Sequence, residues 1–125
     1  MRKPSHKQSA AQPATDELLR RFIGYSMRRA YLTIETAVTD VLQAHDLRVT
    51  AFSALAIILE NPRLTQTALA AALQIERSST VIVVDMLEDR ELITRNKVVN
   101  DRRTYALVAT LRGRKLYDQI AAEIE

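Results

Sequence analysis

Apolar residues recur every three or four positions from Asp16 to about Ala44, which is the spacing of one face of an α-helix. Thr15 precedes this stretch and is placed to cap the helix. At 1.5 Å per residue a helix of this extent measures about 43 Å, which is longer than one small domain needs. We therefore expect part of it to pack against something outside the chain. The repeating residues are Leu18, Leu19, Phe22, Ile23, Met27, Ala30, Tyr31, Ile34, Val38, Val41 and Leu42.

Two shorter helices are predicted next. One begins at a Thr50 cap and ends at about Glu60, because Pro62 disfavours helix at the residue before it. Its apolar residues go nearly all the way round, which predicts a central position in the core. The other begins at a Thr65 cap and continues to Leu73.

A fourth helix follows a break of about three residues at 74–76 and runs from Arg77 to Glu88 or Arg90. Two helices joined by such a short turn form a helix-turn-helix, whose second helix can lie in the major groove of DNA. The residues expected on its inner face are Val81, Val84 and Leu87.

The hydrophobic period then changes. Residues 92–95 and 104–108 are rich in β-prone types, and the largely polar segment 96–103 lies between them, which predicts a β-hairpin with a charged tip. Thr110 then caps a last amphipathic helix, which carries Leu111, Leu116, Ile120 and Ile124 on one side.

Length and composition narrow the class of protein. A chain of 125 residues has room for one domain with one core. It has no cysteine and two histidines, and no acidic residues stand at metal-ligand spacing beside them, so neither a metal site nor another cofactor is expected. No apolar run approaches the roughly 18–20 residues that span a bilayer, and no secretory signal is visible. We expect a protein of the cytoplasm that has no membrane partner.

Charge is distributed unevenly. The polar residues 1–15 carry three bases and no acid, which predicts a flexible basic tail and leaves the rest of the chain neutral. Within that neutral part, residues 93–115 carry seven bases against one acid, which is a possible footprint for a polyanion. The simpler alternative is a solvated face.

Candidate DNA contacts stand at the start of the fourth helix. Arg77, Ser78, Ser79 and Thr80 combine one guanidinium with three short hydroxyls, which suit phosphate oxygens and base edges. The alternative is that the serines only cap the helix.

The hairpin tip makes the prediction more specific. Arg102 and Arg103 follow the helix-turn-helix closely, and an arginine in a narrow minor groove is attracted by its negative potential. Asp101 suits a DNA-facing loop only if it orients one of these arginines. The alternative is an ordinary polar turn.

From Leu47 to Leu116 the sequence resembles the MarR family of winged helix-turn-helix regulators. The stretches that carry the resemblance are 64–70 (LTQTALA), 77–79 (RSS), 84–88 (VDMLE), 92–95 (LITR), 101–103 (DRR) and 110–114 (TLRGR). Each is short, but their order and spacing together are specific. Several positions depart from the family pattern. Ile82 stands where a polar residue is common, Glu91 where a glycine usually ends the recognition helix, Ala68 where a glutamate is frequent and Val99 where a wing proline is common.

The resemblance implies a mainly α-helical fold with a small β-hairpin, in which a winged helix-turn-helix domain is flanked by long N- and C-terminal dimerisation helices. It implies a homodimer on a near-palindromic operator in double-stranded DNA. Members commonly repress transcription and release DNA when a small aromatic or anionic effector binds. The implied segments are a tail at 1–15 and one domain at 16–125, with dimerisation helices at 16–44 and 110–125 and a DNA-binding core at 50–109.

Two sets of site residues follow. The predicted DNA-binding residues are Thr65, Gln66, Thr67, Arg77, Ser78, Ser79, Thr80, Arg95, Lys97, Asp101, Arg102 and Arg103. Aromatic and cationic side chains that could bind an aromatic carboxylate are Tyr25, Arg28, Tyr31, His45 and Phe52. For the second set the alternative is core tyrosines and solvated arginines, with His45 as a hydrogen-bonded connector.

Two other classes of function fit the sequence less well. A winged-helix module that binds protein instead of DNA would have apolar residues at the start of the recognition helix and an uncharged wing. An enzyme is not expected, because the sequence offers no nucleophile–base pair, glycine-rich phosphate loop or metal cluster.

Overall fold

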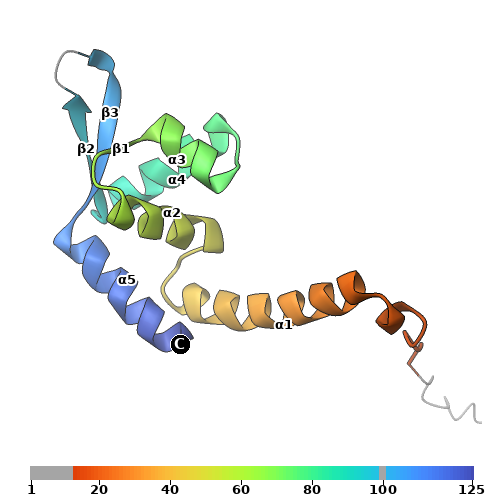
Figure 1. Cartoon of the computed structure of the whole chain (residues 1–125). Helices are drawn as coiled ribbons and strands as arrows, with labels where there is room; N and C mark the ends of the chain where they lie inside the picture. The colour runs from red at the N-terminus through yellow and green to blue at the C-terminus, as the bar shows by residue number, and fades with distance from the viewer. Residues whose placement is uncertain (1–12, 99–100) are drawn as a thin grey trace, which may run out of the picture. The chain divides into compact units, whose positions relative to one another are not determined.

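The computed structural model describes residues 13–98 and 101–125, in two compact units, Met1–Ile34 and Glu35–Glu125 (Figure 1). Most of the predicted basic tail, residues 1–12, lies outside the described part of the chain. None of the described helices is by itself long and apolar enough to cross a membrane.

The first helix is shorter than predicted. A 3-10 turn, η1 (Leu19–Arg21), comes before the long helix α1 (Ile23–Ala44), and Phe22 between them has an extended backbone with φ −101° and ψ 124°. A continuous helix from Asp16 would separate residues 16 and 25 by about 13.5 Å along its axis. The Tyr25 hydroxyl instead donates a hydrogen bond to the Asp16 carboxylate. The break at Phe22 is what allows this contact.

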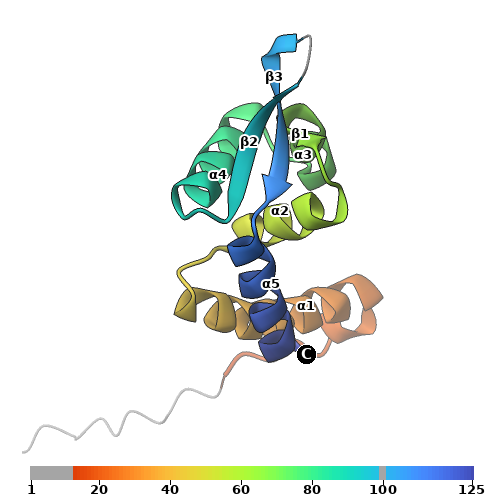
Figure 2. The same cartoon turned by 90° about the vertical axis from the view of Figure 1, so that its left-hand side faces the viewer.

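The second unit is mainly helical with a small antiparallel sheet, as predicted. Its helices are α2 (Val49–Glu60), α3 (Gln66–Leu73), α4 (Arg77–Asp89) and α5 (Leu111–Ile124), and its strands are β1 (Leu64–Thr65), β2 (Ile93–Val98) and β3 (Asp101–Ala109). The sheet order is β1-β3-β2. Within this unit the β2–β3 hairpin projects at one end and α5 lies at the other (Figures 1 and 2).

The core surrounds α2, whose central position is confirmed. Leu55 and Ile58 of α2 are wholly or almost wholly buried, among apolar residues of α3, α4 and the sheet. A second cluster joins the end of α1 to α2 and α5 and contains Leu42, Leu47, Ala51 and Ile120. The first cluster comprises Ala54, Leu55, Ile58, Leu69, Val84, Leu87, Leu92, Ile93 and Leu107.

Two of the predicted helix caps are confirmed and two are wrong. Thr15 caps no helix, because the 3-10 turn begins only at Leu19 and α1 at Ile23. The Thr65 hydroxyl accepts a hydrogen bond from the Ala68 amide at 3.1 Å, and the Thr110 hydroxyl accepts one from the Gly113 amide at 3.0 Å. Thr50 lies inside α2 instead of capping it. The chain leaves its extended conformation one residue earlier, so Arg48 is the cap residue and makes no side-chain cap bond.

The hairpin strands are longer than predicted. Residues 96–98 continue β2 and 101–103 begin β3, so the DRR sequence lies in a strand and not in a broad loop. The register changes at the far end, because Lys97 pairs with Tyr105 whereas Val98 pairs with Asp101. Sequence patterning also missed β1, whose two residues are too few to show a period.

The turn after α4 is formed without glycine. Glu91 adopts a left-handed backbone with φ 60°. Its amide donates to the Glu88 carbonyl at 2.8 Å, and the next amide, of Leu92, donates to the Leu87 carbonyl at 2.9 Å. These two bonds form a Schellman-type helix end. The helix therefore stops cleanly at the position where the resemblance implies a glycine.

Candidate nucleic-acid interface

Helices α3 and α4 form the predicted helix-turn-helix. Gln74 adopts a left-handed backbone with φ 55°, and the amide of Ile75 donates to the Ala70 carbonyl at 3.2 Å. The chain direction turns by 112° between the two helices. This angle is within the range of helix-turn-helix motifs.

The first turn of α4 presents three of its four predicted contacts. Arg77, Ser78 and Ser79 are exposed, and the cap residue before them is Glu76, so neither serine is the cap. The prediction for Thr80 is wrong. Its side chain is wholly buried, and its hydroxyl donates to the Glu76 carbonyl at 3.0 Å.

The orientation of α4 differs from the predicted one by one residue. Thr80, Val84 and Leu87 form the buried face, whereas Val81, expected inside, is 40% exposed. Spacings of three and four residues both fit a helical face. Because residues 80–84 are all β-branched, the sequence fits two rotations of the helix about its axis, which differ in the residues that face the core. The consequence is that Val81 and Ile82 face solvent.

The starts of α3 and α4 come together. Gln66 and Thr67 line a shallow pocket of about 170 Å³ with Arg77 and Val81. Thr65 contributes its hydroxyl to the α3 cap, as described above. Residues that are ten or more positions apart in sequence thus form one exposed polar surface, with the Arg77 guanidinium beside the start of α3.

Arg95 does not extend outward from the wing. Its guanidinium makes ion pairs with the carboxylates of Asp85 and Glu88 on α4, the latter at 3.5 Å. These acids are three residues apart, on one side of the helix next to β2. The predicted DNA contact at Arg95 is therefore corrected: this side chain connects the wing to α4. Counting bases along the sequence could not reveal its acidic partners.

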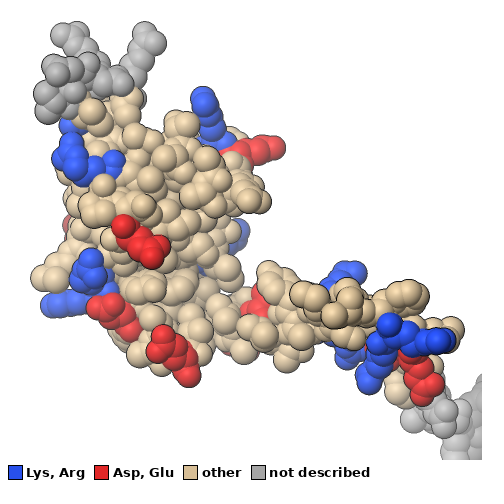
Figure 3. Space-filling view, viewed as in Figure 1, with Lys and Arg blue, Asp and Glu red and all other residues tan. Residues whose placement is uncertain are grey.

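Lys97 keeps a basic side chain on the described part of the wing. Lys97 is exposed on β2, next to Tyr105 of β3. In Figure 3 basic side chains lie just below the end of the described hairpin, and basic and acidic side chains are mixed over the rest of the same face. The side chains of Asp101, Arg102 and Arg103 lie outside the described residues.

Known proteins show the same arrangement. The MarR family model matches residues 47–105. A MarR-family transcriptional regulator from Rhodococcus sp. RHA1 is 31% identical, with a TM-score of 0.75, and the alignment covers 87% of this chain and 77% of that one. The chain belongs to the MarR family.

Two further relatives are informative. The structure of the MarR relative CouR from Rhodococcus jostii RHA1 bound to p-coumaroyl-CoA is 32% identical over 87% of this chain and 77% of that one, with a TM-score of 0.76. The structure of the repressor CouR bound to a 23-mer DNA duplex is 29% identical, with a TM-score of 0.80, and the alignment covers 89% of this chain and 78% of that one. A Thauera aromatica protein, named as a proposed transcriptional regulatory protein for the hcr operon, is 45% identical over 62 residues, which is 50% of this chain but 37% of that protein.

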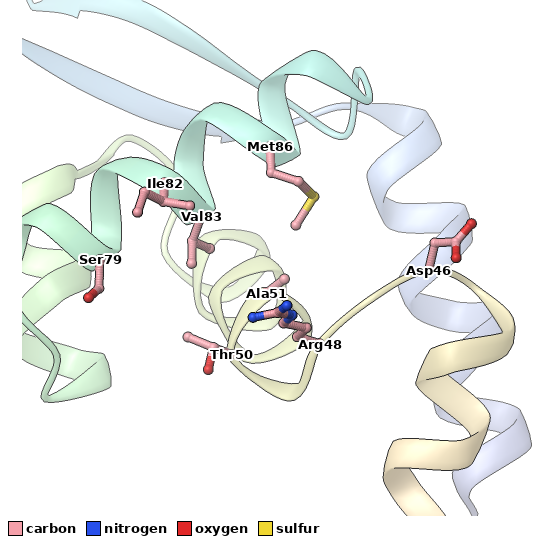
Figure 4. A pocket seen from close by; sticks show the side chains of 8 residues that line it. All are labelled: Asp46, Arg48, Thr50, Ala51, Ser79, Ile82, Val83 and Met86. Atoms are coloured by element: carbon pink, nitrogen blue, oxygen red, sulfur yellow. The ribbon is translucent and has the colours of Figure 1, made fainter.

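This MarR chain also has a larger pocket, of about 500 Å³, between α2 and α4 (Figure 4). Val83 and Met86 point from α4 toward Ala51 on α2, and Arg48 supplies a cation beside them. Sequence reasoning missed Arg48 and Met86, because only the packing of α2 against α4 brings them together. The full lining is Asp46, Arg48, Thr50, Ala51, Ser79, Ile82, Val83 and Met86.

The predicted effector residues do not line that pocket. His45 instead makes a 2.7 Å contact from Nε2 to the Glu123 carboxylate of α5, and Phe52 stacks on Tyr117 with ring centroids 5.4 Å apart. These two are connectors between helices, which corrects their assignment as ligand contacts. The other three belong to the first unit, where Tyr25 and Arg28 line a separate pocket of about 320 Å³ and Tyr31 is 61% exposed.

Proposed function

We propose that this MarR-family protein is a homodimeric, sequence-specific DNA-binding repressor of transcription. In this proposal α4 enters the major groove of a near-palindromic operator, and the β2–β3 wing reaches the adjacent minor groove through Arg102 and Arg103. Such a role places the protein in the compartment that holds the DNA.

The first turn of α4 carries this proposal. Arg77, Ser78 and Ser79 are exposed beside Gln66 and Thr67 of α3, at an interhelical turn that suits groove binding. Asparagine, glutamine, serine and arginine side chains are the groups that read base edges or bind phosphates. The relative CouR has been solved with a DNA duplex, which supports the same use of this surface.

A second copy of the chain is the partner that fits the apolar face of the first unit. Within α1, Ile23 is 80% exposed and the exposed apolar residues follow helical spacing, and Phe22 just before the helix is 66% exposed. Contiguous exposed apolar surface of this kind marks an interaction site. A twofold dimer would present two recognition helices about one turn of DNA apart. The residues of this face are Leu18, Leu19, Phe22, Ile23, Met27, Tyr31 and Ile34.

We further propose an aromatic acyl-CoA thioester as the effector, bound with its acyl group in the α2–α4 pocket. The pocket volume of about 500 Å³ is in the usual range for small ligands, and its lining combines apolar side chains with Arg48 and two hydroxyls. Four of its residues lie on α4, so a ligand there would contact the recognition helix directly. The relative CouR has been solved with p-coumaroyl-CoA.

Selection of binding sites from a random duplex pool tests the DNA-binding proposal. We expect enrichment of an inverted repeat that binds a dimer, with an affinity that falls steeply as salt is raised. Replacement of Arg77 by alanine should weaken binding, whereas Arg112→Ala removes the same charge from α5 and serves as the matched control. Loss of Arg102 and Arg103 without effect on binding would refute the role of the wing.

The protein-binding module remains the second candidate, because Val81 and Ile82 expose apolar surface on α4. Its other expected feature, an uncharged wing, does not match the sequence of β2 and β3. A folded, dimeric protein that enriches no duplex from the pool would favour this alternative over DNA binding.

A further inference from the structure

The outermost line of α4 contains an isoleucine. Ile82 is two residues from Thr80 and two from Val84, and both of those side chains are wholly buried. Two residues along an α-helix correspond to a rotation of about 200°. The Ile82 side chain therefore points away from the core, at the outer edge of the α2–α4 pocket that it helps to line. Ser78, one turn earlier, lies on the same outward line.

The position of Ile82, more than its exposure, distinguishes it from other surface residues. Its side chain is 70% exposed, but single exposed apolar residues are common on protein surfaces. Few of them lie at the centre of the outward face of a recognition helix, beside the exposed polar turn of Arg77 and Ser78. Val81, which is 40% exposed, extends this apolar surface toward α3.

The charges around Ile82 are compatible with DNA at this face. Asp85 follows on nearly the same side of the helix, and a free carboxylate there would repel the phosphate backbone. Arg95 forms an ion pair with that carboxylate, which offsets its charge. The helix can therefore approach a groove without an unpaired acid next to Ile82.

Isoleucine has no hydrogen-bonding group, so it cannot read the donors and acceptors of base edges. The apolar group that the four DNA bases offer in the major groove is the C5 methyl of thymine. A β-branched side chain in a helix also has essentially one χ1 rotamer, so little conformational freedom is lost on contact. We propose, building on the proposed DNA binding, that Ile82 selects operator sequence by contacting thymine methyl groups, on the apolar surface that Val81 extends.

Substitution of deoxyuridine for thymidine in the selected duplex tests this inference. Uracil keeps every hydrogen bond of thymine and lacks only the C5 methyl. At one or two positions in each half-site we expect about a fourfold loss of affinity, the affinity ratio that corresponds to one buried methyl-sized group. Substitution in both half-sites should give roughly fifteenfold, because two independent contacts multiply.

The variant Ile82→Ala assigns the contact to its residue. It should bind thymine and uracil duplexes equally, with an affinity near that of the unchanged protein for the uracil duplex. Val49→Ala removes an exposed branched side chain from α2 and should keep the full sensitivity to uracil. Both side chains are on the surface, so both variants should fold.

Each outcome has a distinct meaning. Tight binding of the selected duplex without sensitivity to uracil at any position overturns the inference and leaves the proposed DNA binding intact. Sensitivity that persists in Ile82→Ala overturns the assignment to Ile82. Enrichment of no duplex at all overturns the proposed function, and the inference with it.

Discussion

Gly113 lies directly against the carbonyl of Leu92. A Cβ built on this glycine would be 2.2 Å from the Leu92 oxygen and 3.3 Å from Cδ1 of Leu55. The same oxygen accepts a hydrogen bond from the Thr110 amide at 3.0 Å. The start of α5 therefore contacts the backbone at the corner between α4 and β2, at a distance that only glycine permits.

We expect Gly113→Ala to destabilise the protein by about 1–3 kcal/mol, as overpacking of a core does, because the methyl group would meet rigid backbone. Chemical denaturation measures this change. Gly24→Ala is the matched control, since none of the described residues has an atom within 4 Å of that Cβ. It should raise stability, by up to about 1 kcal/mol, through helix propensity. Equal effects of the two substitutions would contradict the close contact.

The Arg95–Asp85 pair should contribute to the fold more than to DNA binding. In a double-mutant cycle of Arg95→Ala and Asp85→Ala we expect a coupling of about 0.5–1 kcal/mol in unfolding free energy, as for partly exposed ion pairs. The double variant removes one charge of each sign, so the salt dependence of operator binding should stay as it was. A lower salt slope would instead indicate that Arg95 contacts phosphate.

Glu91 occupies a backbone conformation that favours glycine. With φ at 60°, a residue that carries a Cβ is less stable in the folded state by about 1–2 kcal/mol. Replacement by glycine would remove this strain, but glycine loses more conformational freedom on folding, which offsets part of the gain. We expect Glu91→Gly to raise stability by about 0.5–1 kcal/mol in thermal unfolding. Glu91→Ala separates this effect from loss of the 3.6 Å ion pair with Arg112, and it should bring no gain.

Asp16 gives the first unit a dependence on pH. The Tyr25 hydroxyl that donates to its carboxylate, helped by Arg20 and Arg29, holds the pKa of Asp16 below its ordinary value. Because the folded pKa is lowered, the stabilisation is present above the ordinary value of about 3.9 and is lost as pH falls through the lowered pKa. Tyr25→Phe should move the pKa of Asp16 upward in an NMR titration. An unchanged pKa would show that the arginines alone determine it.

Sequence patterning predicted the elements that depend on local chemistry. Thr65 and Thr110 cap the helices that begin after them, because a cap needs only its own hydroxyl and an amide three residues later. The helix-turn-helix could be predicted for the same reason, since a short break between two helical patterns is also a local feature. The order of helices and strands was therefore largely accessible from the sequence.

The errors at the candidate site concern relationships between elements. Thr80 was expected to be exposed because the run of branched residues from 80 to 84 fits two helical phases, and packing against the core selects one. Arg95 was expected to contact DNA because its partners lie on another element. The hydrophobic periodicity of the sequence could not predict the α2–α4 pocket, because its lining residues come from both helices and the segment before α2.

Thr65 belongs to two structures at once. Its backbone lies opposite Ala106 in the sheet, as the last residue of β1, and its side chain caps α3. No flexible residue separates the wing sheet from the helix-turn-helix at this point, so neither can rotate independently there. A displacement of one is transmitted to the other without a hinge. In the proposed complex, contacts in the two grooves would therefore form and break as a single cooperative event, and the proposed effector would release the DNA from both together.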